Sequence, residues 1–430
     1  MALVELNNNR TSDFICRFAL IERSKCRKYI GGEWVVTPTE TVGLVHDQQD
    51  RQLQLVQMHP ENQKVRKVQQ RLFSLALIHP GYSAPYTSRE RKALLKITVS
   101  IRAHKHLMDP PSTDLPKPPV PYVEGWVFSV QSHIPPPPTP VTKDCCRNFQ
   151  AGRVERRQLL PVERCLRHPP LPGNMEPRTI DLKVLDLLQV GDACNAQVFT
   201  VQILEVRPDP QYFQSNRKLV AKIYDPLYFS DEEGFLNPFH CVDKHYTHEA
   251  HAYNVLSKSH GGRVPRFYGS YSLNIPVDRS EMRTVRLILM EYIPGISMQQ
   301  ANPEKFSRLA RQEIMKSVIN FESQLYEQDI LLTDLHPRNV IMMEKSSFDP
   351  RQDLLFLDFA GALFGRRRDD PVTIESNLFL GRYISPLLRW NKTMAMQFND
   401  WIDWDWQPWI EAEYAHTAAT ITPEMQDTYC

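Results

Sequence analysis

The chain lacks the features that would place it in a membrane or direct it out of the cell. Its 430 residues contain no apolar stretch that approaches the length needed to cross a bilayer. The first ten residues, MALVELNNNR, are polar and have no apolar core of a signal peptide. The 51 Lys and Arg residues nearly balance 50 Asp and Glu, so no overall field favours nucleic acid or a membrane surface. We therefore expect a cytoplasmic or nuclear protein with no transmembrane segment.

The cysteines also lack any pattern that would cross-link the chain or hold zinc. All eight are scattered, with no CxxC pair and no histidine at a zinc-ligand spacing. Cys145 and Cys146 are adjacent, which suits neither an ordinary mutual disulfide nor a metal clamp. We expect free thiols in a reducing compartment.

Proline, by contrast, is abundant: there are 34, and many lie between Pro110 and Pro177. Because proline removes a backbone donor and fixes φ, we expect no long helix or central strand there. We interpret residues 109–176 as a proline-rich linker, partly in polyproline II form, with a ligand for a proline-binding domain as the alternative. Residues 1–108 carry no motif with chemistry and are taken as an accessory or partly disordered segment. A capping box at Thr87 and Glu90 predicts one helix within them, extending to Leu107.

The pattern changes after Arg178, where short apolar strands come first and helical patterns follow. This order is typical of an α+β unit with a sheet-rich front and a helical back. We assign residues 177–417 to this domain and residues 418–430 to a C-terminal tail.

Two loops in this domain carry oxygen-bearing side chains in a suggestive order. Asp334 and Asn339 stand five residues apart in TDLHPRNVI, and the apolar run LLFL ends at Asp358. Phosphoryl transfer needs an acid that orients the attacking hydroxyl and oxygen ligands for the magnesium that bridges the phosphates. An Asp, an Asn and a second Asp in this order supply all three groups.

These motifs resemble the catalytic and metal-binding loops of the protein-kinase-like superfamily. DLHPRN is closer to the aminoglycoside and choline phosphotransferase branch than to ordinary Ser/Thr kinases, since His336 stands where those kinases place Lys. The resemblance implies that Asp334 is the catalytic base and that Asn339 and Asp358 bind magnesium. Ala360 replaces the usual glycine, which is tolerable if its φ is negative.

The same resemblance implies a lysine on a strand and a glutamate on a helix. Lys222 in KLVAKIY fits a contact with the ATP phosphates, and Glu249 in HEAHAYNVL fits the partner that holds this lysine. Taken alone, Lys222 could be an edge-strand charge and Glu249 a solvated helix residue. Their order along the chain favours the functional interpretation.

The remaining nucleotide contacts follow from the resemblance as well. In VRLILMEYIPG, Met290 would be the gatekeeper, with Glu291 and Ile293 offering main-chain contacts to adenine, and Ala221 would line the same site. The glycine-rich loop is reduced to one glycine, Gly191, where kinases usually show three.

Further features separate this chain from ordinary protein kinases. Thr333 replaces the arginine that pairs with a phosphorylated activation loop, and Leu387 follows GRYISP where kinases have Glu. The chain stops soon after the tryptophan-rich WIDWDWQPW, where core packing is expected over stacking of a substrate. Over a little more than half of its length the chain resembles uncharacterised fungal kinase-like proteins.

The sequence thus predicts a bilobal protein-kinase-like α+β fold with a short C-terminal lobe. The function that it predicts is ATP- and magnesium-dependent phosphoryl transfer to a hydroxyl group of a protein or small molecule. A pseudokinase that binds nucleotide or serves as a scaffold is the alternative, and residues 1–176 could also be an interaction module that directs the kinase to a partner.

Overall fold

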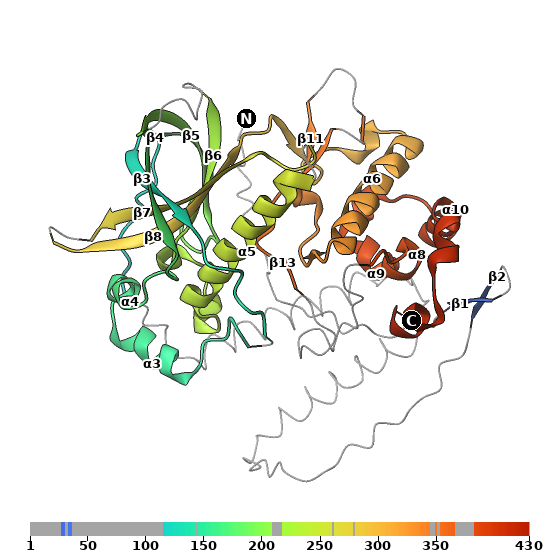
Figure 1. Cartoon of the computed structure of the whole chain (residues 1–430), viewed down its shortest axis with the longest axis horizontal. Helices are drawn as coiled ribbons and strands as arrows, with labels where there is room; N and C mark the ends of the chain where they lie inside the picture. The colour runs from blue at the N-terminus through green and yellow to red at the C-terminus, as the bar shows by residue number, and fades with distance from the viewer. Residues whose placement is uncertain are drawn as a thin grey trace, which may run out of the picture. The chain divides into compact units, whose positions relative to one another are not determined.

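The computed structural model describes residues 27–30, 33–36, 115–142, 144–208, 217–259, 262–277, 280–344, 349–350, 353–365 and 382–429 (Figure 1). The chain divides into two compact units, Met1–Pro38 with Asp114–Cys430, and Thr39–Thr113. The helix expected between Thr87 and Leu107 lies outside the described residues. In the first unit, β1 (Arg27–Ile30) and β2 (Glu33–Val36) form an antiparallel pair.

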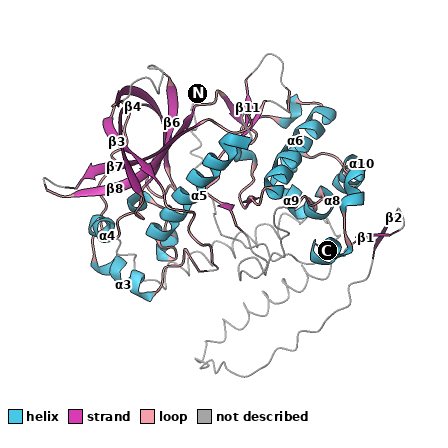
Figure 2. Ribbon diagram, in the orientation of Figure 1, coloured by secondary structure: helices cyan, strands magenta, loops and turns pink. Residues whose placement is uncertain are grey.

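Strands dominate the described residues before about residue 300 and helices dominate after it, as Figure 2 shows. The α+β expectation is therefore confirmed in its coarse form, and the two-lobed arrangement stays a prediction. Six strands form a closed barrel in the order β3-β4-β5-β6-β8-β7. Their bounds are β3 (Val127–Ile134), β4 (Asn174–Gln189), β5 (Gln197–Arg207), β6 (Lys218–Tyr224), β7 (Phe267–Pro276) and β8 (Met282–Glu291).

The barrel corrects the interpretation of residues 109–176 as a linker. β3 pairs antiparallel with both β4 and β7 and so closes the barrel, while α3 (Gln150–Gln158) and α4 (Pro161–Arg167) follow it. The physical reason is the distribution of proline along this stretch. Residues 122–134 and 141–160 contain none, so the strand and the first helix fit between the prolines. Alternate β3 residues, such as Phe128 and Val130, are buried in the barrel.

Helix α5 (Pro238–Ser259) runs beside the barrel (Figure 1) and contacts β6, β7 and β8. Its start follows from local sequence: Pro238 occupies the first turn, and Asn237 accepts hydrogen bonds from the Phe239 and His240 amides. The other helices are α6 (Arg308–Glu327), α8 (Pro386–Arg389), α9 (Lys392–Ala395), α10 (Trp406–Glu413) and α11 (Pro423–Tyr429). Because α11 packs Met425 into a buried cluster, the segment expected to be a tail is structured.

Two large buried clusters, among the three in the described residues, hold the fold together. One fills the barrel interior, and the other joins α5 and α6 to the strands that carry the two acidic loops. Trp390, Trp401 and Trp406 belong to the second cluster, whereas Trp126 packs against the first. The indole N–H of buried Trp401 donates to Met298 O, and that of Trp406 donates to Trp390 O. The expectation that these aromatics pack in the core is confirmed for Trp401 and Trp406.

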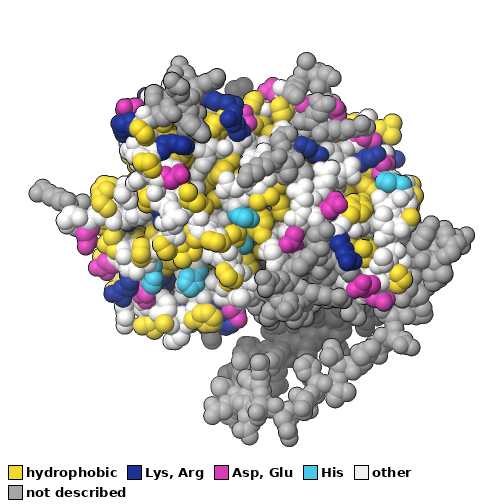
Figure 3. Space-filling view, viewed as in Figure 1, with side chains coloured by type: hydrophobic (Ala, Val, Ile, Leu, Met, Phe, Trp, Pro, Cys, Tyr) yellow, Lys and Arg dark blue, Asp and Glu magenta, His cyan; other side chains and the backbone are white. Residues whose placement is uncertain are grey.

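The compositional expectations concerned charge, membrane-spanning segments and cysteines. Charged side chains of both signs are interspersed on the face shown in Figure 3. Within the described part of the chain, no helix combines the length and apolarity that crossing a membrane requires. The five described cysteines, Cys145, Cys146, Cys165, Cys194 and Cys241, are free thiols.

Candidate active site

Strand pairing brings the two acidic loops together. The loop with Asp334 runs between β10 (Leu331–Leu332) and β11 (Val340–Met343), and the loop with Asp358 runs between β12 (Leu354–Phe356) and β13 (Ala362–Leu363). β10 pairs with β13, and β11 pairs with both β12 and β9 (Gly295–Ser297). Since each loop is held at both ends by strands that pair with those of the other, the two loops must face each other.

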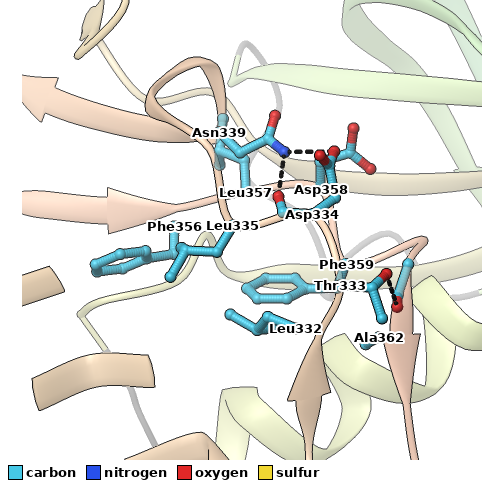
Figure 4. A pocket seen from close by; sticks show the side chains of 11 residues that line it. Leu332, Thr333, Asp334, Leu335, Asn339, Phe356, Leu357, Asp358, Phe359 and Ala362 are labelled. Carbon is cyan, nitrogen blue, oxygen red and sulfur yellow. Dashed lines mark hydrogen bonds between the residues drawn. The ribbon is translucent and has the colours of Figure 1, made fainter. Parts of the chain in front are cut away.

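Asp334, Asn339 and Asp358 line one pocket, where Figure 4 shows them side by side. The Asn339 amide nitrogen donates to the Asp334 carbonyl oxygen at 2.9 Å and to its carboxylate at 3.0 Å. A one-turn helix at Pro337–Asn339 fixes Asn339, and His336 caps this turn by accepting from the Arg338 amide. Asp358 has φ of 60°, a left-handed conformation that Asp tolerates better than most residues. Ala360 is not among the residues with positive φ, so replacing the usual glycine there costs no backbone strain.

Lys222 joins the barrel to both α5 and the Asp358 loop. Its ammonium nitrogen lies 2.6 Å from Glu249 Oε2 and 2.8 Å from Asp358 Oδ1. Glu249 comes from α5, so three elements far apart in sequence meet at one cation. The arrangement is the one expected of a lysine held by a helix-borne glutamate.

The charges of this cluster stabilise one another. Burial alone would lower the pKa of Lys222, but the carboxylates of Asp358 and Glu249 outweigh it and raise the pKa. Burial raises the pKa of Glu249, and the nearby charge of Lys222 only partly offsets this increase. Burial opposes the charge on Asp358 as well, yet Lys222 holds the pKa of Asp358 below its usual range. Lys222 and Asp358 are therefore charged at neutral pH.

Asp334 is held by a residue that the sequence analysis did not single out. Arg338 donates to Asp334 Oδ1 at 2.6 Å. Burial raises the pKa of Asp334 above its usual range, and the Arg338 guanidinium partly opposes this shift. A carboxylate whose pKa is raised is a better proton acceptor, which suits a general base. The spacing of four residues in DLHPR was the available signal for this pair.

The loop around Gly191 has its backbone groups engaged within the protein. Gln197 accepts from the Gly191 amide and donates to the Gly191 carbonyl, both at 2.8 Å. The Cys194 amide donates to Tyr228 O, and the Ala193 amide donates to Asp192 Oδ1. Ala193 has φ of 61°, a conformation that favours glycine. A phosphate at this loop would have to replace some of these contacts.

Of the residues that we expected to contact adenine, only some lie on the face of the sheet that carries Lys222. Met290, Glu291 and Ile293 lie at the end of β8 and just beyond it. Met290 is buried beside Tyr253, while the Glu291 amide donates to Arg266 O. The expectation that Ala221 lines the nucleotide site is corrected. Its side chain points into the barrel interior, as do those of the residues two positions before and after it on β6. Val220 is the small apolar residue on the same face of β6 as Lys222.

Two further contacts were missed by sequence reasoning. Tyr224 donates to Glu249 Oε2 at 2.6 Å, and its place two residues after Lys222 on a strand was the signal. Thr333 donates to Gly361 O at 2.7 Å and so ties the two acidic loops together. A side chain at position 361 would meet Thr333 Oγ1 at 2.6 Å, so this contact needs glycine.

The donor atoms at Asn339 and Asp358 fit a magnesium ion. Because the Asn339 amide nitrogen faces Asp334, its oxygen is the atom left for a cation, and the Asp358 carboxylate lines the same pocket. Magnesium is commonly held by one or two protein ligands together with substrate phosphates. In the described part of the chain, no group of three or more His, Cys, Asp or Glu residues could hold a metal by itself.

Comparison with known proteins supports a kinase-like domain. Residues 243–369 match the model of the ABC1 atypical kinase-like domain, and this segment includes Glu249 and both acidic loops but not Lys222. No curated protein matches the chain. One similar solved structure is Rad53 1-466 in complex with AMP-PNP, at 16% identity and a TM-score of 0.28. That match covers 42% of this chain and 39% of the Rad53 chain.

Proposed function

We propose that this chain transfers the terminal phosphoryl group of ATP to a hydroxyl group of a protein or a small molecule. The observation that carries the proposal is the single cluster of Lys222, Glu249 and Asp358, with Asp334 and Asn339 lining the same pocket as Asp358. These are the groups that such a reaction needs, gathered from β6, α5 and two loops.

Each residue has a defined task in this reaction. Asp334 accepts the proton of the acceptor hydroxyl, whose oxygen forms a bond to the terminal phosphorus. The bond from that phosphorus to the bridging oxygen breaks, and ADP leaves. Lys222 offers positive charge to the phosphates, and Glu249 orients Lys222. Asn339 and Asp358 would hold magnesium, which supplies neutralisation of phosphate charge.

A pseudokinase remains the second candidate because of two specific contacts. Gln197 engages both backbone groups of Gly191, and Lys222 already pairs with Asp358 as well as Glu249. In a protein without turnover, these contacts would persist and the cluster would be a structural ion network.

Two substitutions separate the candidates. Asp334→Asn should leave ATP affinity nearly unchanged and abolish phosphoryl transfer, because Asp334 acts on the acceptor. Lys222→Ala should weaken ATP binding, because a positive charge on the phosphates is lost. ATP binding by calorimetry and ADP release are measured in parallel, with peptides and small alcohols as acceptors. Wild-type protein that binds ATP but releases no more ADP than Asp334→Asn would establish the pseudokinase.

A further inference from the structure

The run from Pro135 to Pro140 contacts α5 through its single non-proline residue. Pro135–Pro138 and Pro140 have no backbone N–H, so Thr139 carries the only amide in this segment, which we call the strap. The Thr139 amide donates to Thr247 Oγ1 at 3.3 Å, and the Thr139 carbonyl lies 2.8 Å from His248 Nε2. Both backbone groups of Thr139 are thus used by consecutive residues of α5.

The second nitrogen of His248 reaches the acidic loop. His248 Nδ1 lies 2.5 Å from the carbonyl oxygen of Ala362, which stands four residues after Asp358. Ala362 pairs with Leu332, two residues before Asp334. The buried imidazole, only 2% exposed, therefore lies between the strap and the strands that hold both acidic loops.

His248 also neighbours the glutamate of the cluster. Glu249 is the next residue of α5, and it reaches Lys222, which in turn reaches Asp358. Any rotation or shift of α5 would move Glu249 relative to the Asp358 loop. The His248 side chain links α5 to Ala362 and opposes such a shift at the turn of α5 that carries Glu249.

We propose that His248 is a positioning residue for the phosphoryl transfer proposed above. In one tautomer its ring N–H donates to Ala362 O, which holds α5 and the Asp358 loop in register, and in the other it donates to Thr139 O, which anchors the strap. This inference rests on the proposed function for its effect on activity, but the link itself is a separate structural statement. Burial lowers the pKa of His248, although the two carbonyls oppose that shift. The neutral ring carries one N–H and donates to one carbonyl at a time.

Two amide side chains can separate the two links. Asn places its NH₂ near the position of Nδ1, so His248→Asn keeps a donor for Ala362 O. Gln places its NH₂ near the position of Nε2, so His248→Gln keeps a donor for Thr139 O. His248→Ala removes both. His251→Gln is the matched control, since His251 lies on the same helix and its ring contacts Phe364.

The readouts are ATP-dependent phosphoryl transfer and hydrogen exchange at the amides of Thr139 and Ala362. These amides donate to Thr247 Oγ1 and Phe359 O, so their exchange reports local opening of the strap and of the Asp358 loop when the carbonyl links of His248 are lost. His248→Ala should lower kcat by about 10- to 100-fold, as expected for misplaced groups, with ATP affinity changed far less. It should also speed exchange at both amides. His248→Asn should restore slow exchange at Ala362 and most of kcat, whereas His248→Gln should restore slow exchange only at Thr139.

The outcomes distinguish this inference from the proposed function. If the wild type has no turnover, the phosphotransferase proposal fails, while hydrogen exchange still tests the two links. If His248→Asn behaves like His248→Ala at Ala362, or if His251→Gln produces the same changes, the imidazole merely fills space and the positioning role is wrong.

Discussion

At the scale of single residues, the site depends on pairs that balance burial against charge. Lys222 is shared by two carboxylates, and Asp334 is shared by Arg338 and Asn339. Removing one member of a buried pair leaves the other charge uncompensated, so such residues are sensitive to substitution. The balance at Asp334 has a consequence for the pH dependence of activity.

Arg338→Gln should move the acid limb of kcat/KM to higher pH. Burial raises the pKa of Asp334 and Arg338 opposes that shift, so losing the guanidinium raises the pKa of Asp334 further. Because the base must be ionised, activity falls as pH drops through this pKa, and the variant loses activity at a higher pH than the wild type. The test is a pH profile of kcat/KM. Arg311→Gln, which breaks a pair with Asp403, is the control and should leave the profile unchanged.

At the scale of elements, the loop between β4 and β5 combines a glycine-poor sequence with a conformation that favours glycine. Ala193 has positive φ, whereas buried Ala196 is not among the residues with positive φ. The two alanines lie three residues apart in one loop, so they form a matched pair for testing whether backbone strain is stored there.

Ala193→Gly should stabilise the protein by up to about 1 kcal/mol, and Ala196→Gly should destabilise it by about 1 kcal/mol. At position 193 the substitution relieves a strained backbone, which outweighs the added freedom of the unfolded chain. At position 196 the substitution removes a buried methyl group. It also adds conformational freedom to the unfolded chain, and no backbone strain is relieved. Denaturant unfolding of both variants measures the difference, and equal shifts in the same direction would show that Ala193 is not strained.

At the scale of the whole molecule, the barrel and the helical part depend on residues that precede the segment matched by the family model. Tyr122 donates to Asp225 at 2.5 Å, β3 closes the barrel, and the strap contacts α5. The unit that must fold together therefore includes at least the residues from about 120 onward. An N-terminal boundary at residue 177, as the composition favoured, would remove all three features.

Deleting residues 1–114 should leave the remaining chain folded, whereas deleting residues 1–140 should destabilise it by several kcal/mol. The longer deletion removes the buried side chains of Tyr122, Phe128 and Val130, each worth about 1.5–3 kcal/mol, and opens the edges of β4 and β7. Thermal unfolding of the two truncated proteins measures this. Equal Tm values would show that β3 contributes nothing to the barrel.

The sequence by itself determined that strands precede helices after Arg178. Its loop motifs, through the family resemblance, predicted the roles of five site residues: Lys222, Glu249, Asp334, Asn339 and Asp358. It could do so because strand alternation, helix spacing and loop motifs are local properties. Whether those residues meet was decided only by tertiary structure, since Lys222 and Asp358 lie 136 positions apart.

Three further features were decided by the tertiary structure alone. They are the role of residues 115–173, the face of β6 on which Ala221 lies, and the hydrogen-bond partners of His248. A count of prolines averages over a segment, whereas barrel closure depends on one proline-free stretch and its register with β4 and β7. Likewise, no local pattern reveals that one imidazole lies between carbonyls 109 and 114 positions away, because hydrogen bonds between distant segments exist only once the chain has packed.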